Sequence, residues 1–288
     1  MDYFHVDVFS SAPMKGNGLT VVFPKQPLTA DEMLQITCEF KQFETIFVGS
    51  IDESGAFPVR IFTVDEELKF AGHPILGAAA VVHSRFCTAQ KDTELQFDLS
   101  GRRVKVQSVR TNSGYQAVMN QGAPAFITRV DKAHYPAIAQ ALGLSPDAID
   151  TALPVEVVST GLPYLLVPLV NGLCDAKIAL KDFEGFLVDF GAKFVYVFDA
   201  QTLECRTWDN LGLTEDVATG SAAGPLCAYL VKNGLKQADE IIKLRQGGYT
   251  GRPSILEGWV SGSNGVAEVF IRGDVSFFAS GSIDYSVR

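Results

Sequence analysis

Two short stretches of this sequence, one in each half of the chain, are predicted to form helices that are apolar on every side. The first follows Gly72-His73-Pro74 and the second follows Gly220-Ser221, and both are rich in glycine and alanine. A helix without a polar face is not stable on a protein surface, so each must be enclosed by other parts of the chain. The chain therefore needs two separate layers of structure, each large enough to surround a helix.

The segments before these helices also match each other. Arg60-Ile-Phe62 precedes the first helix and Arg206-Thr-Trp208 precedes the second. The two arginines lie 146 positions apart, and His73 and Ser221 lie 148 positions apart, in a chain of 288 residues. The alternative is coincidence between small-residue helices. We prefer the interpretation of two similar halves, residues 1–120 and 121–277, each a strand layer curled around one buried helix.

The remaining patterns predict many short strands and few further helices. Apolar runs predict strands over 4–9, 19–23, 45–48, 59–63 and 104–109, and over 161–170, 193–199, 205–208, 255–260 and 266–271. Thr29 and Glu32 have the spacing of a capping box ahead of an amphipathic helix, and a second such helix is predicted over 135–142. Strands and helices do not alternate regularly, so an α+β architecture is favoured over a doubly wound parallel sheet.

Composition and charge exclude several classes of function. A formal charge of −9 argues against nucleic acid as the main partner, because phosphate binding needs a concentrated basic face. No apolar run is long enough for a membrane span, and the first residues lack the features of a signal peptide. The five cysteines show no C-x-x-C spacing, and the histidines share no metal-ligand spacing. We expect a cytoplasmic protein without metal, cofactor, nucleic-acid or membrane partner.

The starts of the two buried helices are candidate ligand sites. A helix N-terminus presents unpaired N–H groups and partial positive charge, and Gly72 and Gly220 would let a ligand approach the backbone closely. If the halves are related by a pseudo-twofold axis, both helix starts face one cleft, where a small carboxylate substrate would bind. The alternative is that these glycines only permit tight packing of helix on strand.

Four polar side chains are candidates for chemistry. His73 and Ser221 occupy matching places at the two helix starts, and Asp216 lies five residues before Ser221. Glu44 begins a strand between Phe43 and Ile46, where desolvation would raise the pKa of its carboxyl group towards values useful in a general base. Each has a structural alternative: a core histidine, a helix-capping aspartate, or an edge-strand acid that points into water.

Several of these segments together resemble the signatures of the phenazine-biosynthesis PhzF-like family. They are RIFTVDEELKFAGHPILGAA from Arg60, EDVATGSA from Glu215, the segment from Gln246 to Ser254, QFETIF around Glu44, and Gly16-Asn17. The resemblance covers nearly the whole chain. It implies a fold like that of diaminopimelate epimerase, with two pseudo-symmetric barrel-like, mostly antiparallel halves around central helices, and a C-terminal strand near 278–288 that returns to the first half.

The resemblance also implies an activity and a set of site residues. It implies a cofactor-independent isomerase, and a homodimer, that acts on a small carboxylate similar to trans-2,3-dihydro-3-hydroxyanthranilate. Glu44 would be the base, with His73 and Asp216 assisting proton movement. The substrate would be bound by Asn17, Gly72, Gly220 and Ser221. A lyase or hydratase that uses the same base, and a non-catalytic binding protein on the same fold, remain open alternatives.

Some positions depart from the family pattern. Val64 and Val217 stand where proline is common, Phe43 replaces a small polar residue, and Ile75 replaces a threonine. Phe43 and Ile75 are expected to line the pocket and to change its specificity. The epimerases of this fold use a cysteine at each helix start, and the matching residues here are not cysteine, which excludes two-thiol racemisation.

Overall fold

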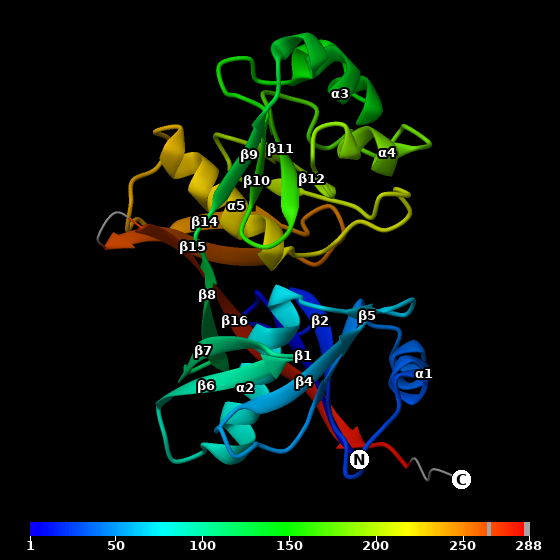
Figure 1. The fold of residues 1–288 in the computed structure, drawn as a ribbon, viewed down its shortest axis with the longest axis vertical. Helices are drawn as coiled ribbons and strands as arrows, with labels where there is room; N and C mark the ends of the chain where they lie inside the picture. Colours follow the sequence, from blue (N-terminus) through cyan, green and yellow to red (C-terminus); the bar gives the residue numbers. More distant parts are fainter. Residues whose placement is uncertain (264–265, 285–288) are drawn as a thin grey trace. The chain divides into compact units, whose positions relative to one another are not determined.

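The computed structural model describes residues 1–263 and 266–284, and the chain divides into two compact units (Figure 1). Unit 1 comprises Met1–Asn120 and a C-terminal segment that begins at Arg272, and unit 2 comprises Gln121–Ile271. The end of the expected returning strand, residues 285–288, lies outside the described residues. No helix in the described ranges has both the length and the apolar character needed to cross a membrane.

Among the described residues, eight strands of unit 1 form a closed barrel in which neighbours are mostly antiparallel. Their order around the barrel is β1, β2, β3, β4, β6, β7, β8 and β16, and pairing of β16 with β1 closes it. Parallel pairs occur between β2 and β3 and between β4 and β6. The bounds are β1 Asp2–Val8, β2 Asn17–Phe23, β3 Glu44–Val48, β4 Phe57–Phe62, β6 Asp92–Leu99, β7 Arg102–Arg110, β8 Tyr115–Gly122 and β16 Val266–Ser282, with the short β5 Glu67–Leu68 paired to β4.

Helix α2 (Gly72–Phe86) is enclosed by this barrel. Every residue from Gly72 to His83 is buried, and the helix packs against β1, β2, β3, β6 and β7. Gly77 permits the close approach, because a Cβ atom there would lie 2.4 Å from Leu19 Cδ2 and 3.0 Å from Val8 Cγ2. The expectation of a helix wrapped on all sides is confirmed for this half.

Helix α1 (Ala30–Phe40) lies outside the barrel against β3 and β4. The expected capping box is present: Glu32 N donates to Thr29 Oγ1 at 3.3 Å, and Thr29 N donates to Glu32 Oε2 at 2.7 Å. The inner face of the helix contributes Met33 and Ile36 to a cluster with Phe47 of β3.

Unit 2 is built on a five-stranded sheet and a smaller group of strands around a second buried helix. The sheet order is β13 (Cys205–Arg206), β12 (Phe194–Asp199), β11 (Pro163–Leu169), β10 (Glu156–Ser159) and β9 (Ala125–Arg129), and only β11 and β12 are parallel. Strands β14 (Ile242–Gln246), β15 (Ser254–Ser263) and the first part of β16 continue the unit. Helix α5 (Gly220–Lys232) packs against β10, β11 and β15 and is buried along most of its length.

A separate core supports unit 2 away from α5. It contains helices α3 (Tyr135–Ala141) and α4 (Phe183–Val188), and the 3-10 turns Lys132–His134 and Pro146–Ala148 flank α3. Leu165, Val167 and Val197 of the sheet pack with Ile138 and Phe183 in this core. The predicted helix over 135–142 is thus confirmed, one residue shorter.

The two units repeat one another down to a specific ion pair. In unit 1 the Arg60 guanidinium donates to both carboxylate oxygens of Glu67 at 2.7 and 2.6 Å. In unit 2 Arg206 donates to both oxygens of Glu215 at 2.9 and 2.7 Å. Each guanidinium also lies over the aromatic ring two positions further along its strand, at 5.2 and 4.7 Å from the centroid. The predicted α+β fold of two pseudo-symmetric halves is confirmed.

The sequence patterns missed several strands. Strands β5, β6, β8, β9, β10 and β14 were not predicted, and β15 and β16 extend well beyond the predicted 255–260 and 266–271. In β6 only Leu95, Phe97 and Leu99 are buried, and polar residues alternate with them. A strand with one solvated face contains no continuous apolar run, which is why it escaped detection.

The tight packing of α2 generates a prediction about stability. Gly77→Val would place two methyl groups against Leu19 and Val8, and we expect the free energy of unfolding to fall by about 1–3 kcal/mol. Urea denaturation monitored by circular dichroism measures the loss. Gln35→Ala on the exposed face of α1 is the control and should change stability by less than about 0.5 kcal/mol. Equal stabilities for the two variants would contradict this account of α2.

The repeated ion pair generates a second prediction. The Arg206 and Glu215 side chains are only 9% and 14% exposed, whereas those of Arg60 and Glu67 are 34% and 37% exposed. Glu215→Gln leaves a buried guanidinium without its counter-ion, so we expect it to lower the free energy of unfolding by about 3 kcal/mol. The matched Glu67→Gln should cost about 1 kcal/mol or less. Parallel denaturation curves test the difference, and equal losses would contradict it.

Candidate active site

A buried carboxylate and a buried imidazole face each other at the amino end of α2. Glu44 begins β3 and is 7% exposed, and His73 is the second residue of α2 and is 6% exposed. Glu44 Oε2 lies 3.2 Å from His73 Nε2. A carboxyl group this close to an imidazole, and shielded from water, can exchange a proton with a ligand.

The strand register explains why these two residues meet. Leu19 of β2 is paired with Glu44 of β3, so their side chains point to the same face of the barrel wall. Leu19 points inward, because it contacts α2 at Gly77. His73 lies four residues before Gly77, about one turn closer to the amino end of the helix. Glu44 therefore points into the barrel at the level of His73.

Asn17 belongs to the same region of unit 1. It lies two residues before Leu19 on β2, so the alternation of the strand also directs it inward, and it is almost fully buried. Gly16 permits the turn into β2: its φ is +71°, and a Cβ atom there would lie 2.4 Å from the carbonyl oxygen of Val8. Asn17, Glu44 and His73 thus come from three separate elements to one end of the barrel.

The start of α2 has no side-chain cap. The N-cap residue is Ala71, whose methyl side chain cannot accept a hydrogen bond from the first-turn amides. Pro74 has no N–H of its own, which leaves the amides of Gly72 and His73 as the leading donors of the helix. The partial positive charge at this end favours an anionic group nearby.

Burial controls the protonation of His73. Desolvation lowers the pKa of its imidazole from 6.5 to about 3. Loss of hydration on burial is the cause, and the imidazole is neutral at physiological pH. Within the described residues Nε2 makes no hydrogen bond of standard geometry, so it is available to Glu44 or to a bound molecule.

The candidates of unit 2 form a second group around the start of α5. Asp216 Oδ2 accepts a hydrogen bond from Thr219 Oγ1 at 2.5 Å, and Asp216 Oδ1 accepts one from Ala218 N at 3.4 Å. Ser221 Oγ lies 2.7 Å from the hydroxyl of Tyr164 on β11. The Gly220 carbonyl accepts from Gln121 Nε2 at 2.9 Å. Asp216 thus shapes the turn that leads into α5.

Gln246 holds this turn in place and was not among the predicted site residues. Its Nε2 donates to the Asp216 carbonyl at 2.9 Å and to Thr219 Oγ1 at 3.0 Å. Its Oε1 accepts from Thr219 N at 3.1 Å and from the Tyr196 hydroxyl at 2.9 Å. In the sequence, the only indication of a role for Gln246 was its position at the start of the segment from Gln246 to Ser254, which resembles a family signature. Tyr164, the partner of Ser221, had no signal at all.

The positions that depart from the family pattern differ in burial. Ile75 is completely buried in the first turn of α2, two residues after His73. Phe43 and Val64 are exposed, at 39% and 43%. That Phe43 and Ile75 line the substrate pocket stays a prediction.

The thiol nearest in sequence to the start of α5 is buried, and the described residues contain no cluster of metal-ligating side chains. Burial raises the pKa of Cys227, the thiol nearest the start of α5, to about 12, so it stays protonated and unreactive. No cluster of three histidine, cysteine, aspartate or glutamate side chains with the arrangement of a metal site occurs among residues 1–263 and 266–284. The mouths of the two helices carry His73 and Ser221, which supports the exclusion of a two-thiol mechanism.

Comparison with known proteins points to one family. The model of the family described as phenazine biosynthesis-like protein (PhzC-PhzF) matches residues 6–281. Trans-2,3-dihydro-3-hydroxyanthranilate isomerase from Pseudomonas chlororaphis is 31% identical over 98% of each chain. The solved structure of a predicted epimerase from Pseudomonas aeruginosa is 42% identical over 99% of each chain, with a TM-score of 0.90. A hydroxyproline epimerase from Agrobacterium vitis, 14% identical, shares the fold over 98% of this chain and 91% of its own, with a TM-score of 0.62.

The neutral state of His73 generates a prediction about pH. Between about pH 6.5 and pH 3 the unfolded chain binds one more proton at this residue than the folded chain, so acidification favours unfolding. We expect this group to remove up to about 1.4 kcal/mol of stability per pH unit below pH 6. His73→Gln should lack that part of the loss, as measured by urea denaturation between about pH 7 and pH 5. The exposed His134→Gln is the control; identical pH dependence in wild type and His73→Gln would contradict the prediction.

Proposed function

The chain belongs to the phenazine biosynthesis-like (PhzC-PhzF) family and is an isomerase, and we propose that Glu44 moves a proton between two carbon atoms of a small cyclic carboxylate. The observation that carries the proposal is the buried Glu44–His73 contact at 3.2 Å. A carboxylate held away from water in a fixed orientation is suited to take a proton from carbon.

The proposed reaction is balanced within one substrate molecule. Glu44 removes a proton from an sp³ carbon, and the electron pair left behind enters the adjacent conjugated system. The same carboxyl group then returns the proton to a different carbon of that system. No atom is gained or lost and no net oxidation occurs, so we propose that the chain's own groups suffice without a cofactor.

His73 orients and tunes the base in this proposal. Because its imidazole is neutral, His73 carries one ring N–H. With that N–H on Nε2, His73 can donate to Oε2 of the Glu44 carboxylate at 3.2 Å and hold it in place, and the proton taken from the substrate then stays on the Glu44 carboxyl group until it is returned. The uncapped amides at Gly72 add positive potential next to the charge that develops on the substrate.

We propose substrate-binding roles for the remaining candidates. Asn17 and the Gly72 amide would bind polar groups of the substrate from unit 1. Gly220 and Ser221, whose hydroxyl is positioned by Tyr164, would bind through the start of α5, and Asp216 would assist proton movement. Similarity to the dihydro-hydroxyanthranilate isomerase suggests that compound, or a related cyclic acid, as the substrate. The homodimer and the cytoplasmic location stay predictions.

Proton NMR in D₂O tests the proposal. We expect wild type to convert trans-2,3-dihydro-3-hydroxyanthranilate or a related cyclic acid to its isomer, and to introduce deuterium at a carbon position because the Glu44 carboxylic acid exchanges its proton with the solvent before the return. Glu44→Gln retains the shape of the side chain but has no basic oxygen, so exchange should fall by at least about 10²-fold. His73→Gln should reduce the rate by a smaller factor.

The controls separate loss of the base from loss of the fold. Glu39→Gln, an exposed substitution on α1, should leave exchange unchanged, and each variant is compared with wild type by circular dichroism. Exchange that persists in Glu44→Gln would reject this assignment of the base. Loss of the 3-hydroxyl during exchange would instead support a lyase, and the absence of exchange with every acid tested would support a binding protein.

A further inference from the structure

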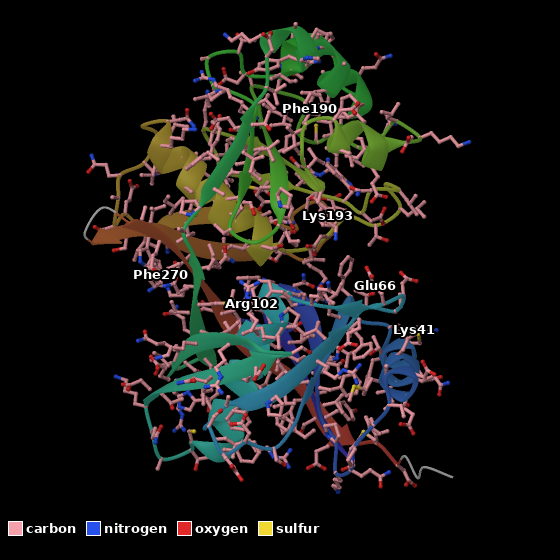
Figure 2. All side chains as sticks on the ribbon, in the orientation of Figure 1. Lys41, Glu66, Arg102, Phe190, Lys193 and Phe270 are labelled. Atoms are coloured by element: carbon pink, nitrogen blue, oxygen red, sulfur yellow. The ribbon has the colours of Figure 1, made fainter. Side chains whose placement is uncertain are left out.

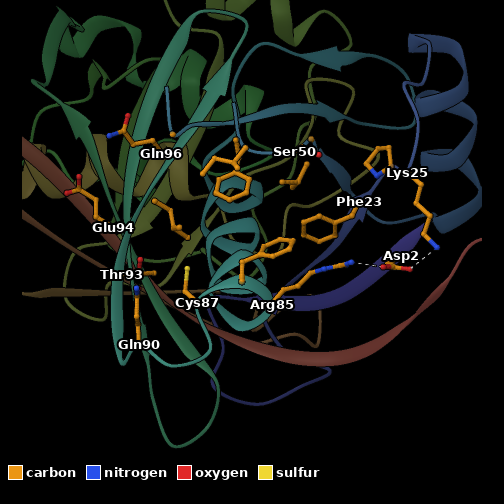
Figure 3. Close-up of a pocket in the computed structure, with 18 residues that line it drawn as sticks. Asp2, Phe23, Lys25, Ser50, Arg85, Cys87, Gln90, Thr93, Glu94 and Gln96 are labelled. Atoms are coloured by element: carbon orange, nitrogen blue, oxygen red, sulfur yellow. Dashed lines mark hydrogen bonds and ion pairs between the residues drawn. The ribbon is translucent and has the colours of Figure 1, made fainter. Parts of the chain in front are cut away.

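A cavity lies in unit 1 at the carboxyl end of α2 (Figure 3). Its volume is about 620 Å³, within the range of small-molecule sites. Phe86 and Cys87 at the end of α2 line it. With a helical rise of 1.5 Å per residue, Phe86 is roughly 20 Å along the axis from His73. The cavity is therefore separate from the Glu44–His73 contact.

Aromatic rings form one wall of this cavity. Phe57 and Phe86 are stacked with centroids 6.2 Å apart and an interplanar angle of 23°. Phe23 meets Phe86 edge-on at 5.9 Å. Phe86 is 55% exposed, so much of its ring remains uncovered at the end of the stack. Such a wall favours a planar ring as the next layer.

The four charged side chains that line the cavity, Asp2, Glu94, Lys25 and Arg85, sum to zero, and Lys105, which pairs with Glu94 from outside the lining, makes the whole cluster positive by one charge. Asp2 contacts two cations, Arg85 Nη2 at 2.7 Å and Lys25 Nζ at 3.8 Å, as the dashed lines of Figure 3 show. The hydrogen bond from Arg85 lowers the pKa of Asp2, so that carboxylate stays ionised. The remaining lining carboxylate, Glu94, is paired with Lys105 at 3.0 Å. A cationic spot on a chain of charge −9 favours an anionic ligand.

We propose that this cavity binds a planar aromatic monocarboxylate, with its ring stacked on Phe86 and its carboxylate between Lys25 and Arg85. Arg85 is held for this contact by its position over the rings of Phe23 and Phe86, at 4.7 and 5.3 Å from the centroids. Its Nη2 donates to Asp2 Oδ2 at 2.7 Å, which leaves other N–H donors of the guanidinium for a ligand. Both parts of the ligand, the ring and the charge, are thus matched by groups of unit 1.

Isothermal titration calorimetry with 2-naphthoate tests the site, and 2-naphthamide serves as a neutral ligand of the same shape. We expect the carboxylate to bind wild type more tightly than the amide. Lys25→Gln, at a side chain that is 72% exposed, should weaken naphthoate binding roughly two- to fivefold and leave amide binding unchanged. Phe86→Ala should weaken both ligands roughly two- to tenfold.

Matched substitutions elsewhere are the controls. Lys181→Gln removes an exposed lysine of unit 2, and Phe278→Ala removes a phenylalanine of unit 1 that is 52% exposed and does not line the cavity. Neither should alter naphthoate affinity. Absence of naphthoate binding, equal affinity for acid and amide, or unchanged affinity in both Lys25→Gln and Phe86→Ala would each overturn the proposal. All four substitutions lie outside the proposed catalytic residues, so proton exchange should persist in them.

Cys87 reports where the ligand binds. Its thiol is partly buried in the cavity wall, whereas Cys38 and Cys174 are exposed elsewhere. We expect saturating 2-naphthoate to slow alkylation of Cys87 by N-ethylmaleimide several-fold, as followed by peptide mass spectrometry, without slowing Cys38 or Cys174. Equal alkylation of Cys87 with and without naphthoate would overturn the assignment of the ligand to this cavity.

Discussion

Burial of α2 on every side is the constraint on which unit 1 depends. The helix has no polar face to offer water, so the barrel must close around it, and Gly77 lets Leu19 and Val8 come within packing distance of its backbone. Only the helix ends can then carry polar groups. Figure 2 shows how densely the side chains fill the space around these elements. The pairing of β2 with β3 places Glu44 at the amino end of α2. The packing that buries the helix therefore also positions the carboxylate beside its first residues.

The same burial decides which side chains can react. Desolvation keeps the imidazole of His73 neutral and keeps the thiol of Cys227 protonated. A neutral histidine beside a carboxylate can position and share a proton, whereas a buried thiol with a raised pKa is a poor acid or base at physiological pH. The fold is shared with a hydroxyproline epimerase from Agrobacterium vitis, but a shared fold does not fix the reaction, which depends on the side chains of each site.

The parts of this architecture that sequence could predict are those encoded by local patterns. All-round apolarity marked α2 and α5, and the capping box at Thr29 marked the start of α1. Contacts between segments far apart in the sequence leave no local pattern and could not be predicted. The bond between Ser221 and Tyr164 joins residues 57 positions apart, and Gln246 reaches the Asp216 carbonyl across 30 positions. Glu44 depends on both kinds of information. Its flanking residues suggested desolvation, but only the pairing of the barrel strands shows that its side chain is buried.

The two halves use one framework for different tasks. Both place an arginine–glutamate pair ahead of a buried helix, yet the first helix start carries a carboxylate–imidazole contact and the second carries hydroxyl and amide hydrogen bonds. A single carboxyl group that removes and returns a proton needs no second group of equal basicity. On the proposed mechanism, the second helix start therefore serves mainly to bind the substrate, with Asp216 beside it to assist proton movement.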